Sequence, residues 1–545
     1  MNKVNKIVLL LLLFCLPSLA NGKSWFGRDV SRLFILGGEL SNSAATSVAD
    51  IDEVMPRMAA LGLNTVLVPA YWDLIEPVEG QYDFTLIDRV IDRARENHLQ
   101  VVFLWFGVWK NSMSCYAPLW FKQDTKRFPR VMTRNGKPLE IASAFSEEVF
   151  QADCKVFTKL VEHLAAKDPR KETVIMLQIE NEIGMLEDAR DHSPLAEKVY
   201  NKRQGSKGKE QVATSVYPET LESDEQFMAE HYARYVERLA QVARRIYDVP
   251  LYVNAAMNSR GRKPGEYPSA GPLAHLAPIW KKYAPTVDLL APDIYDAGFK
   301  SWASQYALPD NPLFIPESRC CENSGVRALY AFGQFDALGF SPFAIDQSPA
   351  QDTQHVTAAY RLIRQMKSYI LKARQQAWKK GSWQTENGQW GVLFDKEDRE
   401  EIINDGDLVM TCRHFFTLPW DARAQAKQWA EGGAIIHKMA PDEYLIAGSG
   451  VVVEFNTKSE KQQEEQKVLG EDGFADQGNG QASALQNQRW KGKRMGIGYV
   501  DQVEIDERGQ LKFIRRDNGD QDHQGRHARI SVGEYKILHV KLYKY

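Results

Sequence analysis

The chain has 545 residues, more than one compact core usually holds, so two or three domains are expected. Hydrophobic residues make up 44% and charged residues 26% of the chain, a balance that excludes a disordered or fibrous protein. A formal net charge of −3 argues against the strongly basic surface with which proteins bind nucleic acids.

The first twenty residues have the pattern of a secretory signal peptide. Lys3 and Lys6 precede an apolar run over residues 7–16, and Ser18-Leu19-Ala20 fits a small-residue cleavage site. We therefore expect residues 1–20 to be removed and the mature chain to be secreted, with the periplasm as its destination. No later run reaches the roughly 20 apolar residues that a membrane helix needs, so we expect no stable membrane insertion.

Five cysteines follow residue 20: Cys115, Cys154, Cys320, Cys321 and Cys412. An odd number leaves at least one thiol unpaired within the chain. Their spacings match no zinc-binding pattern, so we expect most of them to be buried as small apolar side chains. A disulfide bond that involves Cys320 or Cys321 stays open as the alternative.

Eight short apolar runs alternate with amphipathic helical stretches in the first two thirds of the chain. The runs cover residues 33–36, 65–69, 101–106, 174–179, 251–255, 289–294, 313–316 and 340–345. Over residues 86–94 the apolar positions recur at spacings of three and four, which indicates a helix between two runs. Apolar strands that alternate with helices predict a parallel sheet, and eight of them predict an α/β fold, a (β/α)₈ TIM barrel over residues 21–375.

Two long insertions, residues 107–150 and 184–225, follow the third and fourth apolar runs. Barrel enzymes build their specificity in loops at this end of the strands. Residues 202–211 of the second insertion are polar and rich in lysine, so we expect a solvated loop there. A helix over residues 357–374 is expected to close the barrel.

Beyond residue 375 the chain changes to β-like runs. They cover residues 391–394, 444–447, 451–455, 495–500, 511–514 and 535–542, with a hairpin turn at residues 506–509. This pattern predicts a smaller all-β, sandwich-like domain over residues 376–545. The polar residues around 457–488 are expected to form an exposed loop or a disordered insert. We expect a structural domain, because no cluster of exposed aromatic residues is recognisable in it; a polysaccharide-binding surface is the alternative.

Carboxylates end two of the predicted barrel strands. The fourth run leads into residues 178–184, QIENEIG, and the seventh run ends at Glu317. Strand alternation predicts that Glu180 and Glu182 point to the same side, with Glu182 nearer the barrel mouth. Hydrolysis of a glycosidic bond needs two carboxyl groups on either side of the anomeric carbon, and Glu182 and Glu317 are the candidates. An ion-pair cluster at a strand end is the structural alternative.

These motifs resemble those of the retaining TIM-barrel glycosidases that carry their catalytic carboxylates on strands four and seven. Within that clan, two motifs are similar to those of glycoside hydrolase family 35: the stretch from Trp72 through Glu76 to Phe84, and QIENEIG. The layout of the whole chain resembles bacterial members of that family that have a C-terminal β domain, some of which act on xyloglucan. The resemblance implies Glu182 as the acid/base, Glu317 as the nucleophile, and release of terminal galactose from plant cell-wall oligosaccharides such as xyloglucan side chains.

Further residues at predicted strand ends are candidates for substrate binding. They are Tyr71, Trp72, Glu76, Trp109, Lys110, Asn111, Asn181 and Tyr295. Trp109 is a possible stacking platform for a sugar ring, Glu76 either binds hydroxyl groups or braces its loop, and a structural role is kept open for Glu39. The resemblance implies that the Tyr295 hydroxyl contacts Glu317.

No cofactor and no metal are expected, and the predicted partner is an oligosaccharide rather than a nucleic acid. Three alternatives remain for the function: a family 42-like galactosidase, an endo-acting enzyme of the same clan, and a non-catalytic carbohydrate-binding barrel.

Overall fold

A computed structural model describes residues 32–205, 220–259, 261–379, 388–418, 429–464, 490–519 and 521–545. The predicted signal peptide, residues 1–20, and residues 206–211 of the predicted solvated loop lie outside the described residues. Within the ranges described, no helix is long and apolar enough to cross a membrane.

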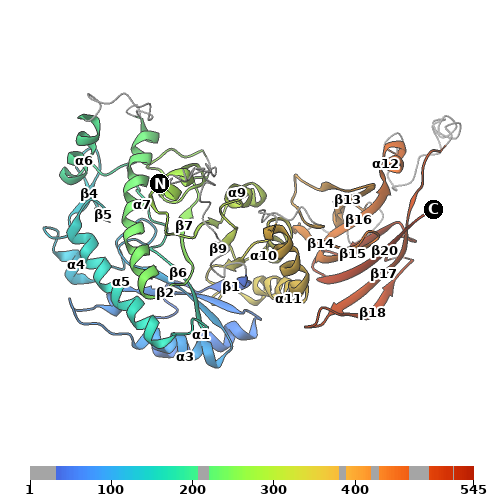
Figure 1. Ribbon diagram of the computed structural model, residues 1–545, viewed down its shortest axis with the longest axis horizontal. Helices are drawn as coiled ribbons and strands as arrows, with labels where there is room; N and C mark the ends of the chain where they lie inside the picture. The colour runs from blue at the N-terminus through green and yellow to red at the C-terminus, as the bar shows by residue number, and fades with distance from the viewer. Residues whose placement is uncertain are drawn as a thin grey trace, which may run out of the picture.

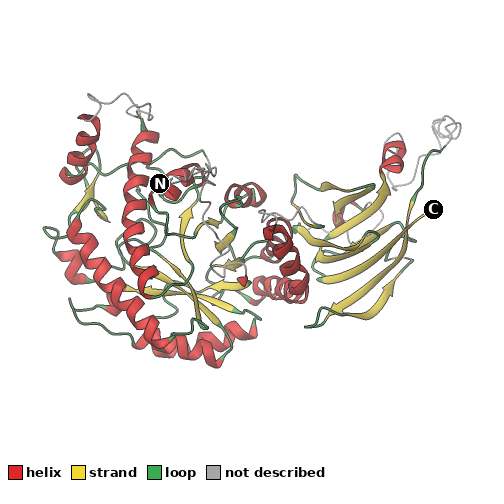
Figure 2. Ribbon diagram, in the orientation of Figure 1, coloured by secondary structure: helices red, strands yellow, loops and turns green. Residues whose placement is uncertain are grey.

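The N-terminal part is a closed barrel of eight parallel strands, which confirms the predicted fold (Figures 1 and 2). In barrel order the strands are β1 (Ile35–Glu39), β2 (Thr65–Tyr71), β3 (Gln100–Phe106), β6 (Val174–Gln178), β7 (Leu251–Ala256), β8 (Leu289–Ile294), β9 (Phe314–Ser318) and β10 (Gly339–Pro342). Each apolar run of the sequence supplies one strand, because helices cover the outer face of such a strand and side chains fill the inner one.

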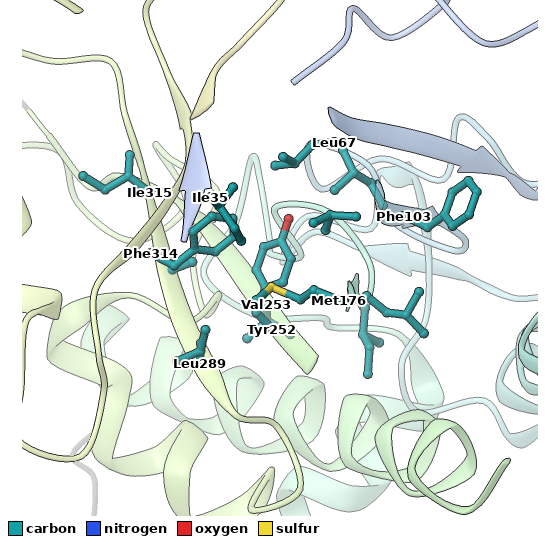
Figure 3. Packing of buried hydrophobic residues seen from close by; sticks show 14 of the residues in the cluster. Ile35, Leu67, Phe103, Met176, Tyr252, Val253, Leu289, Phe314 and Ile315 are labelled. Atoms are coloured by element: carbon teal, nitrogen blue, oxygen red, sulfur yellow. The ribbon is translucent and has the colours of Figure 1, made fainter. Parts of the chain in front are cut away.

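Side chains from different strands pack together inside this part of the molecule. Figure 3 shows Ile35 of β1, Met176 of β6, Tyr252 of β7 and Phe314 of β9 in one apolar cluster. The rings of Tyr252 and Phe314 meet edge to face with their centroids 5.2 Å apart. The barrel is therefore filled, and polar groups that act on a substrate must stand at its rim.

Helices surround the barrel: α1 (Val48–Ala60), α3 (Thr85–Glu96), α5 (Glu147–Lys167), α7 (Leu221–Ile246), α8 (Ala277–Tyr283), α9 (Phe299–Tyr306), α10 (Ser324–Phe335) and α11 (Ala350–Lys379). In α3 the periodic residues Ile87, Val90, Ile91 and Ala94 are the buried ones, as the spacing predicts. The predicted closing helix is α11, which is longer at both ends than the periodic stretch.

The two insertions contact each other. The first holds α4 (Leu119–Gln123) and a hairpin of β4 (Arg130–Met132) and β5 (Pro138–Ala142), and the second holds α6 (Pro194–Gly205). The Met132 amide donates to Asp191 Oδ1 at 3.1 Å, and the His192 amide donates to the Met132 carbonyl at 2.8 Å. The two insertions thus form one structured wall rather than two separate loops.

The C-terminal part consists of two antiparallel sheets that share a core. One has the strand order β11-β14-β15-β20-β17-β18 and the other β12-β13-β16-β19. The strands are β11 (Gln389–Phe394), β12 (Glu400–Asp405), β13 (Leu408–His414), β14 (Gly432–Ala440), β15 (Glu443–Ser449), β16 (Val451–Thr457), β17 (Met495–Ile505), β18 (Leu511–Asp517), β19 (His527–Ile530) and β20 (Lys536–Lys544). The other face of the larger sheet packs on α10 and α11, which lie between the barrel and the sheets (Figure 1).

Four of these strands, β12, β13, β14 and β19, were not predicted. Strand β12 is an edge strand with the sequence EEIIND, so charged residues hide its alternation. The predicted turn at residues 506–509 joins β17 to β18, with Gly509 at φ 77°. The polar insert begins with a short helix, α12 (Lys458–Glu464), rather than a loop, and residues 465–488 of it lie outside the described residues.

All five cysteines of the described ranges are unpaired, so the open alternative of a bridge at Cys320 or Cys321 is absent there. Only Cys412 is buried, at β13; Cys115 is exposed and the other three are half-buried. The prediction that most of them are buried was therefore wrong. It assumed core positions, whereas Cys115 lies in the first insertion and Cys320 and Cys321 lie just past the end of β9.

Candidate active site

The loop after β3 shapes the segment that follows β6. Glu180 and Glu182 have positive φ angles of 58° and 45°, a conformation that is uncommon for residues other than glycine. The backbone N–H of Asn181 donates to the Trp109 carbonyl at 3.2 Å. The backbone N–H groups of Asn111 and Ser112 donate to the carbonyls of Asn181 and Glu182, at 3.1 Å each. These bonds offset the backbone strain.

The prediction that Glu180 and Glu182 point to the same side was wrong. Glu180 Oε2 accepts the Trp109 amide at 2.8 Å, and the Glu180 carboxyl meets Asp153 of α5. Asp153 in turn accepts from Trp105 Nε1 at 2.9 Å and from the Tyr235 hydroxyl at 2.8 Å. The alternation of side chains ends with β6 at Gln178, because residues with a left-handed backbone conformation, such as Glu180 and Glu182, do not continue the pleat of a strand.

Glu182 instead faces Glu317 across the barrel mouth. Glu317 belongs to β9, three barrel strands beyond β6. One carboxyl oxygen of each of Glu182, Asp293 and Glu317 lies within 4.8 Å of the other two. All three are nearly inaccessible to solvent, with exposed fractions of 6%, 1% and 3%. The structure therefore brings the two predicted carboxylates together and adds a third.

Three hydrogen-bond donors hold Glu317. Asn181 Nδ2 and Asn254 Nδ2 donate to its Oε1 at 3.1 and 3.2 Å, and the Tyr295 hydroxyl donates to its Oε2 at 2.8 Å. The contact expected between Tyr295 and Glu317 is thus present. Donors of this kind stabilise the ionised form of a carboxyl group.

Glu182 has a different environment. Its backbone amide donates to Asn254 Oδ1 at 2.9 Å, and Asn111 Nδ2 donates to its Oε2. Burial, followed by the negative charge of Glu317, raises the pKa of Glu182 to about 7, although Lys110 acts in the opposite direction. A carboxyl group with this pKa holds its proton in mildly acidic solution and can act as a general acid.

Lys110 is the cation of the site. Its ammonium group donates to Asn181 Oδ1 at 2.8 Å and lies 5.0 Å from the centre of the Phe106 ring. Burial alone would lower the pKa of Lys110, but the carboxyl groups of Glu317, Glu182, Glu39 and Asp293 raise it. Glu39, fully buried at the end of β1, has its pKa raised well above the usual range by burial and by Glu317.

Asn254 and Asp293 are site residues that the sequence analysis missed. Asn254 Nδ2 donates to Asp293 Oδ2 at 2.8 Å as well as to Glu317. Both residues lie inside apolar runs that had been recognised as strands, β7 and β8. A polar residue within such a run was the available signal, because burying it requires a partner.

Four of the predicted binding residues do not belong to the site. Trp109 is fully buried, edge-on to Tyr232 and Tyr235 of α7 at 5.4 and 4.7 Å, so it cannot stack on a sugar. Tyr71 is buried against Phe106 and Tyr116. The physical reason is that these aromatic side chains fill the space under the helices and loops beside the barrel mouth.

Trp72 and Glu76 form a loop brace. Trp72 Nε1 donates to Glu76 Oε2 at 2.9 Å, the Gly80 amide donates to Glu76 Oε1 at 2.7 Å, and Trp120 Nε1 donates to the Glu76 carbonyl at 3.0 Å. Both carboxyl oxygens are therefore occupied within the protein. Of the two roles considered for Glu76, the structure shows the bracing one.

The spacing of the three carboxyl groups alone would admit a cation. The donor set argues otherwise, because amide and hydroxyl groups of Asn111, Asn181, Asn254 and Tyr295 already direct their hydrogens at these oxygens. The Lys110 ammonium stands beside them. The absence of a metal and of a cofactor stays a prediction.

Two family models match the chain. Residues 44–241 match the glycoside hydrolase family 42 model described as β-galactosidase, and residues 356–529 match a domain of unknown function, DUF5597. A comparison with curated proteins gave no match. The first segment includes Glu182 and ends within α7, before the strand that carries Glu317.

Solved structures that resemble the chain include three β-galactosidases. The enzyme from Bacillus circulans sp. alkalophilus is 15% identical with a TM-score of 0.47, and the match covers 63% of this chain and 57% of that one. The enzyme from the Antarctic haloarchaeon Halorubrum lacusprofundi is 16% identical with a TM-score of 0.42, and the match covers 60% of this chain and 57% of that one. The enzyme from the psychrophilic Marinomonas ef1 is 14% identical with a TM-score of 0.43, and the match covers 61% of this chain and 60% of that one. The chain thus spans less than two thirds of the length of these proteins. The family matched is 42, which had been kept as an alternative to family 35. Residues 44–241 of the chain are therefore similar to the β-galactosidases of glycoside hydrolase family 42.

Proposed function

We propose that the protein is a retaining exo-β-galactosidase with Glu182 as the acid/base and Glu317 as the nucleophile. The observation that carries the proposal is the distance of at most 4.8 Å between an oxygen of Glu182 and one of Glu317. Retaining enzymes hold their two carboxyl groups about 5–5.5 Å apart, whereas inverting enzymes leave roughly 6.5–9.5 Å for a water molecule.

The environments of the two groups assign their roles. Burial and Glu317 raise the pKa of Glu182 to about 7, so it carries the proton. Glu317 accepts three hydrogen bonds and is the carboxylate that attacks the anomeric carbon. In the first step the leaving oxygen takes the Glu182 proton while Glu317 bonds to the sugar; in the second, Glu182 takes a proton from water, which displaces Glu317.

For the substrate we propose terminal galactose on plant cell-wall oligosaccharides, such as xyloglucan side chains. The proposal rests on the resemblance to family 35 and on the two insertions, which contact each other through Met132, Asp191 and His192. Such a wall would close one end of the cleft and leave room for a single sugar. An endo-acting enzyme and a non-catalytic barrel are the competing functions.

Secretion, with the periplasm as destination, belongs to the same proposal. Its support is the charged and apolar pattern of residues 1–20. Imported or partly digested cell-wall glycans would meet the enzyme in that compartment.

The roles are tested with Glu317→Ala and Glu182→Ala on an aryl β-galactoside. Glu317→Ala should lose turnover on every substrate. Glu182→Ala should retain the first step, because an activated phenol needs little protonation, while turnover of substrates with poor leaving groups falls by roughly 10²–10⁴-fold. Azide should restore turnover in Glu182→Ala alone and yield the β-galactosyl azide. Equal loss in both variants without rescue would contradict the assignment.

The substrate is tested by product analysis with the wild-type protein. A galactosylated xyloglucan oligosaccharide should have a higher kcat/KM than lactose, because contacts with the remote part of the substrate contribute in the transition state. Free galactose should be the only sugar released. Internal cleavage, or faster turnover of lactose, would argue for one of the alternatives.

A further inference from the structure

The active site holds more buried carboxyl groups than its cation can balance. Glu39, Glu182, Asp293 and Glu317 have exposed fractions of at most 6%, and Lys110 is the ammonium group among them, at 4%. A buried charge without a partner is very costly, so buried carboxyl groups without a counter-ion take up a proton. Lys110 balances the charge of one carboxylate, so the neutral form is favoured for the other carboxyl groups.

The hydrogen bonds of Asp293 leave one of its oxygens, Oδ1, free to carry a proton. Asp293 Oδ2 accepts Asn254 Nδ2 at 2.8 Å. No N–H or O–H donor of the described residues reaches Asp293 Oδ1, which is completely buried. The Asp293 carboxyl instead faces the Glu182 carboxyl, with one oxygen of each no more than 4.8 Å apart. Two carboxyl oxygens attract each other only when one of them carries a proton.

We propose that Asp293 is a positioning residue that stays protonated on Oδ1 and donates a hydrogen bond to the carboxyl group of Glu182. Its role would be to stabilise the carboxylate that Glu182 becomes after it has protonated the leaving oxygen. This inference rests on the proposed function and extends it to a third carboxyl group.

The charge balance of the first step explains why a third carboxyl group is useful. The Glu317 oxygen forms the bond to the anomeric carbon and loses its negative charge. The leaving oxygen keeps the electron pair of the broken bond and takes the Glu182 proton, so the charge arrives on Glu182. Asp293 lies within 4.8 Å of both groups and pairs in register with Glu317 on the neighbouring strand, so its O–H can serve Glu182 without moving.

The surroundings of Asp293 favour its neutral form. Burial, and then the neighbouring carboxyl groups of Glu317, Glu182 and Glu39, raise the pKa of Asp293 well above its usual range. The titratable groups that face it from the packed elements are Glu39, Lys110, Glu182, Tyr252, Tyr295, Tyr306 and Glu317. Lys110 is the cation of this set, and the three tyrosines are neutral hydroxyl groups.

The kinetic test compares Asp293→Ala and Asp293→Asn with the wild type on an aryl galactoside and on a substrate with a poor leaving group. Asp293→Ala removes the donor to the Glu182 carboxylate, so the alkaline limb of kcat/KM should move up by about one pH unit, the typical spread of side-chain pKa values in proteins. Asp293→Asn offers an N–H in place of the O–H and should keep the limb where it is. Asp296→Asn, in the loop that follows β8, is the matched control and should change neither the rate nor the alkaline limb.

Three outcomes would overturn the inference. A limb that moves to lower pH in both variants would mean that Asp293 is ionised in the wild type. An unmoved limb with a raised KM in Asp293→Ala would make it a substrate-binding residue, and an unmoved limb with only a lower Tm would make it a packing residue.

An infrared difference spectrum separates this inference from the proposed function. At pH 7, wild type minus Asp293→Asn should show the carbonyl band of a protonated carboxyl group. A carboxylate band in its place would refute the inference. This readout needs no turnover, so it remains decisive even if galactosides prove not to be substrates.

Discussion

Glu182 and Glu317 have identical side chains, and only their neighbours separate their roles. Three donors converge on Glu317, and two of them are the side-chain amides of Asn181 and Asn254. The Asn181 side chain also accepts a hydrogen bond from Lys110, and the Asn254 side chain also contacts Asp293 and the Glu182 backbone. A change of one pKa unit corresponds to about 1.4 kcal/mol of differential interaction between the protonation states. A few buried hydrogen bonds of one to two kcal/mol each are therefore enough to make one group the acid and the other the base.

Under the proposed function, the pH dependence of turnover follows from the raised pKa of Glu182. Because Glu182 must carry a proton to act as an acid, kcat/KM should decline as the pH rises through about 7, the value to which burial and Glu317 raise its pKa. Since the proposed mechanism needs one protonated and one ionised carboxyl group, the profile should be bell-shaped with its optimum below neutrality. The measurement is kcat/KM on an aryl galactoside between pH 4 and 9 (roughly the range that spans both limbs). Activity that still rises at the alkaline end would contradict a carboxyl group as the acid.

At the scale of elements, Arg374 is one of the residues that tie α11 to the barrel. Arg374 is fully buried and donates from Nε to both carboxyl oxygens of Asp336 at 2.9 Å. It also donates to the carbonyls of Leu33, which precedes β1, and of Ala337, which precedes β10, at 2.6 and 3.0 Å. The helix therefore fixes the junction where the first and last strands close the barrel.

Arg374→Leu should destabilise the protein severely. The substitution leaves the Asp336 carboxyl group and several carbonyls buried without their partner, and breaking a buried ion pair in this way typically costs about 3–5 kcal/mol. The measurement is the free energy of unfolding in urea. Arg170→Ala is the control, because Arg170 and its partner Glu172 have exposed fractions of 80% and 63%, and an exposed pair contributes about 0–1 kcal/mol. Equal effects of the two substitutions would show that Arg374 is not a structural link.

At the scale of the whole molecule, the larger β sheet is a middle layer. One of its faces meets the smaller sheet, and the other supplies Leu393, Ile435, Leu445 and Ile537, among others, to the barrel's own apolar cluster. Arg327 of α10 pairs with Glu431 at 2.6 Å, and the Ile505 amide donates to Gln365 of α11 at 2.8 Å. The C-terminal sheets thus complete the core on one side of the barrel.

Glycines allow α10 to approach this sheet closely. A Cβ atom added at Gly333 of α10 would lie 2.9 Å from the Gly391 Cα and 3.0 Å from the Trp390 carbonyl oxygen on β11. Gly333→Val should therefore push helix and sheet apart at a cost of about 1–3 kcal/mol, as overpacking of a filled core does. Urea unfolding followed by both tryptophan fluorescence and galactosidase activity measures the effect.

Because the two parts share one core, both signals should be lost in a single transition. Gly498→Val on β17, where the nearest atom to an added Cβ is 3.3 Å away and the residue is exposed, should leave stability almost unchanged. If Gly333→Val were as stable as the control, or if the sheets unfolded well before activity is lost, the shared core would not govern stability.

The sequence by itself determined the barrel. A strand that is covered on both faces must be apolar throughout, and such apolar runs can be recognised directly in the sequence. It also located Glu182 and Glu317, since carboxylates directly after apolar strands stand out. Only the tertiary structure showed that Glu180 turns away from Glu182, because two positive φ angles end the strand alternation. It likewise placed Asn254 and Asp293 in the site and Trp109 beneath α7. Whether a polar or aromatic side chain faces a cleft or a helix depends on residues that contact it from distant parts of the chain, and the local pattern does not contain them.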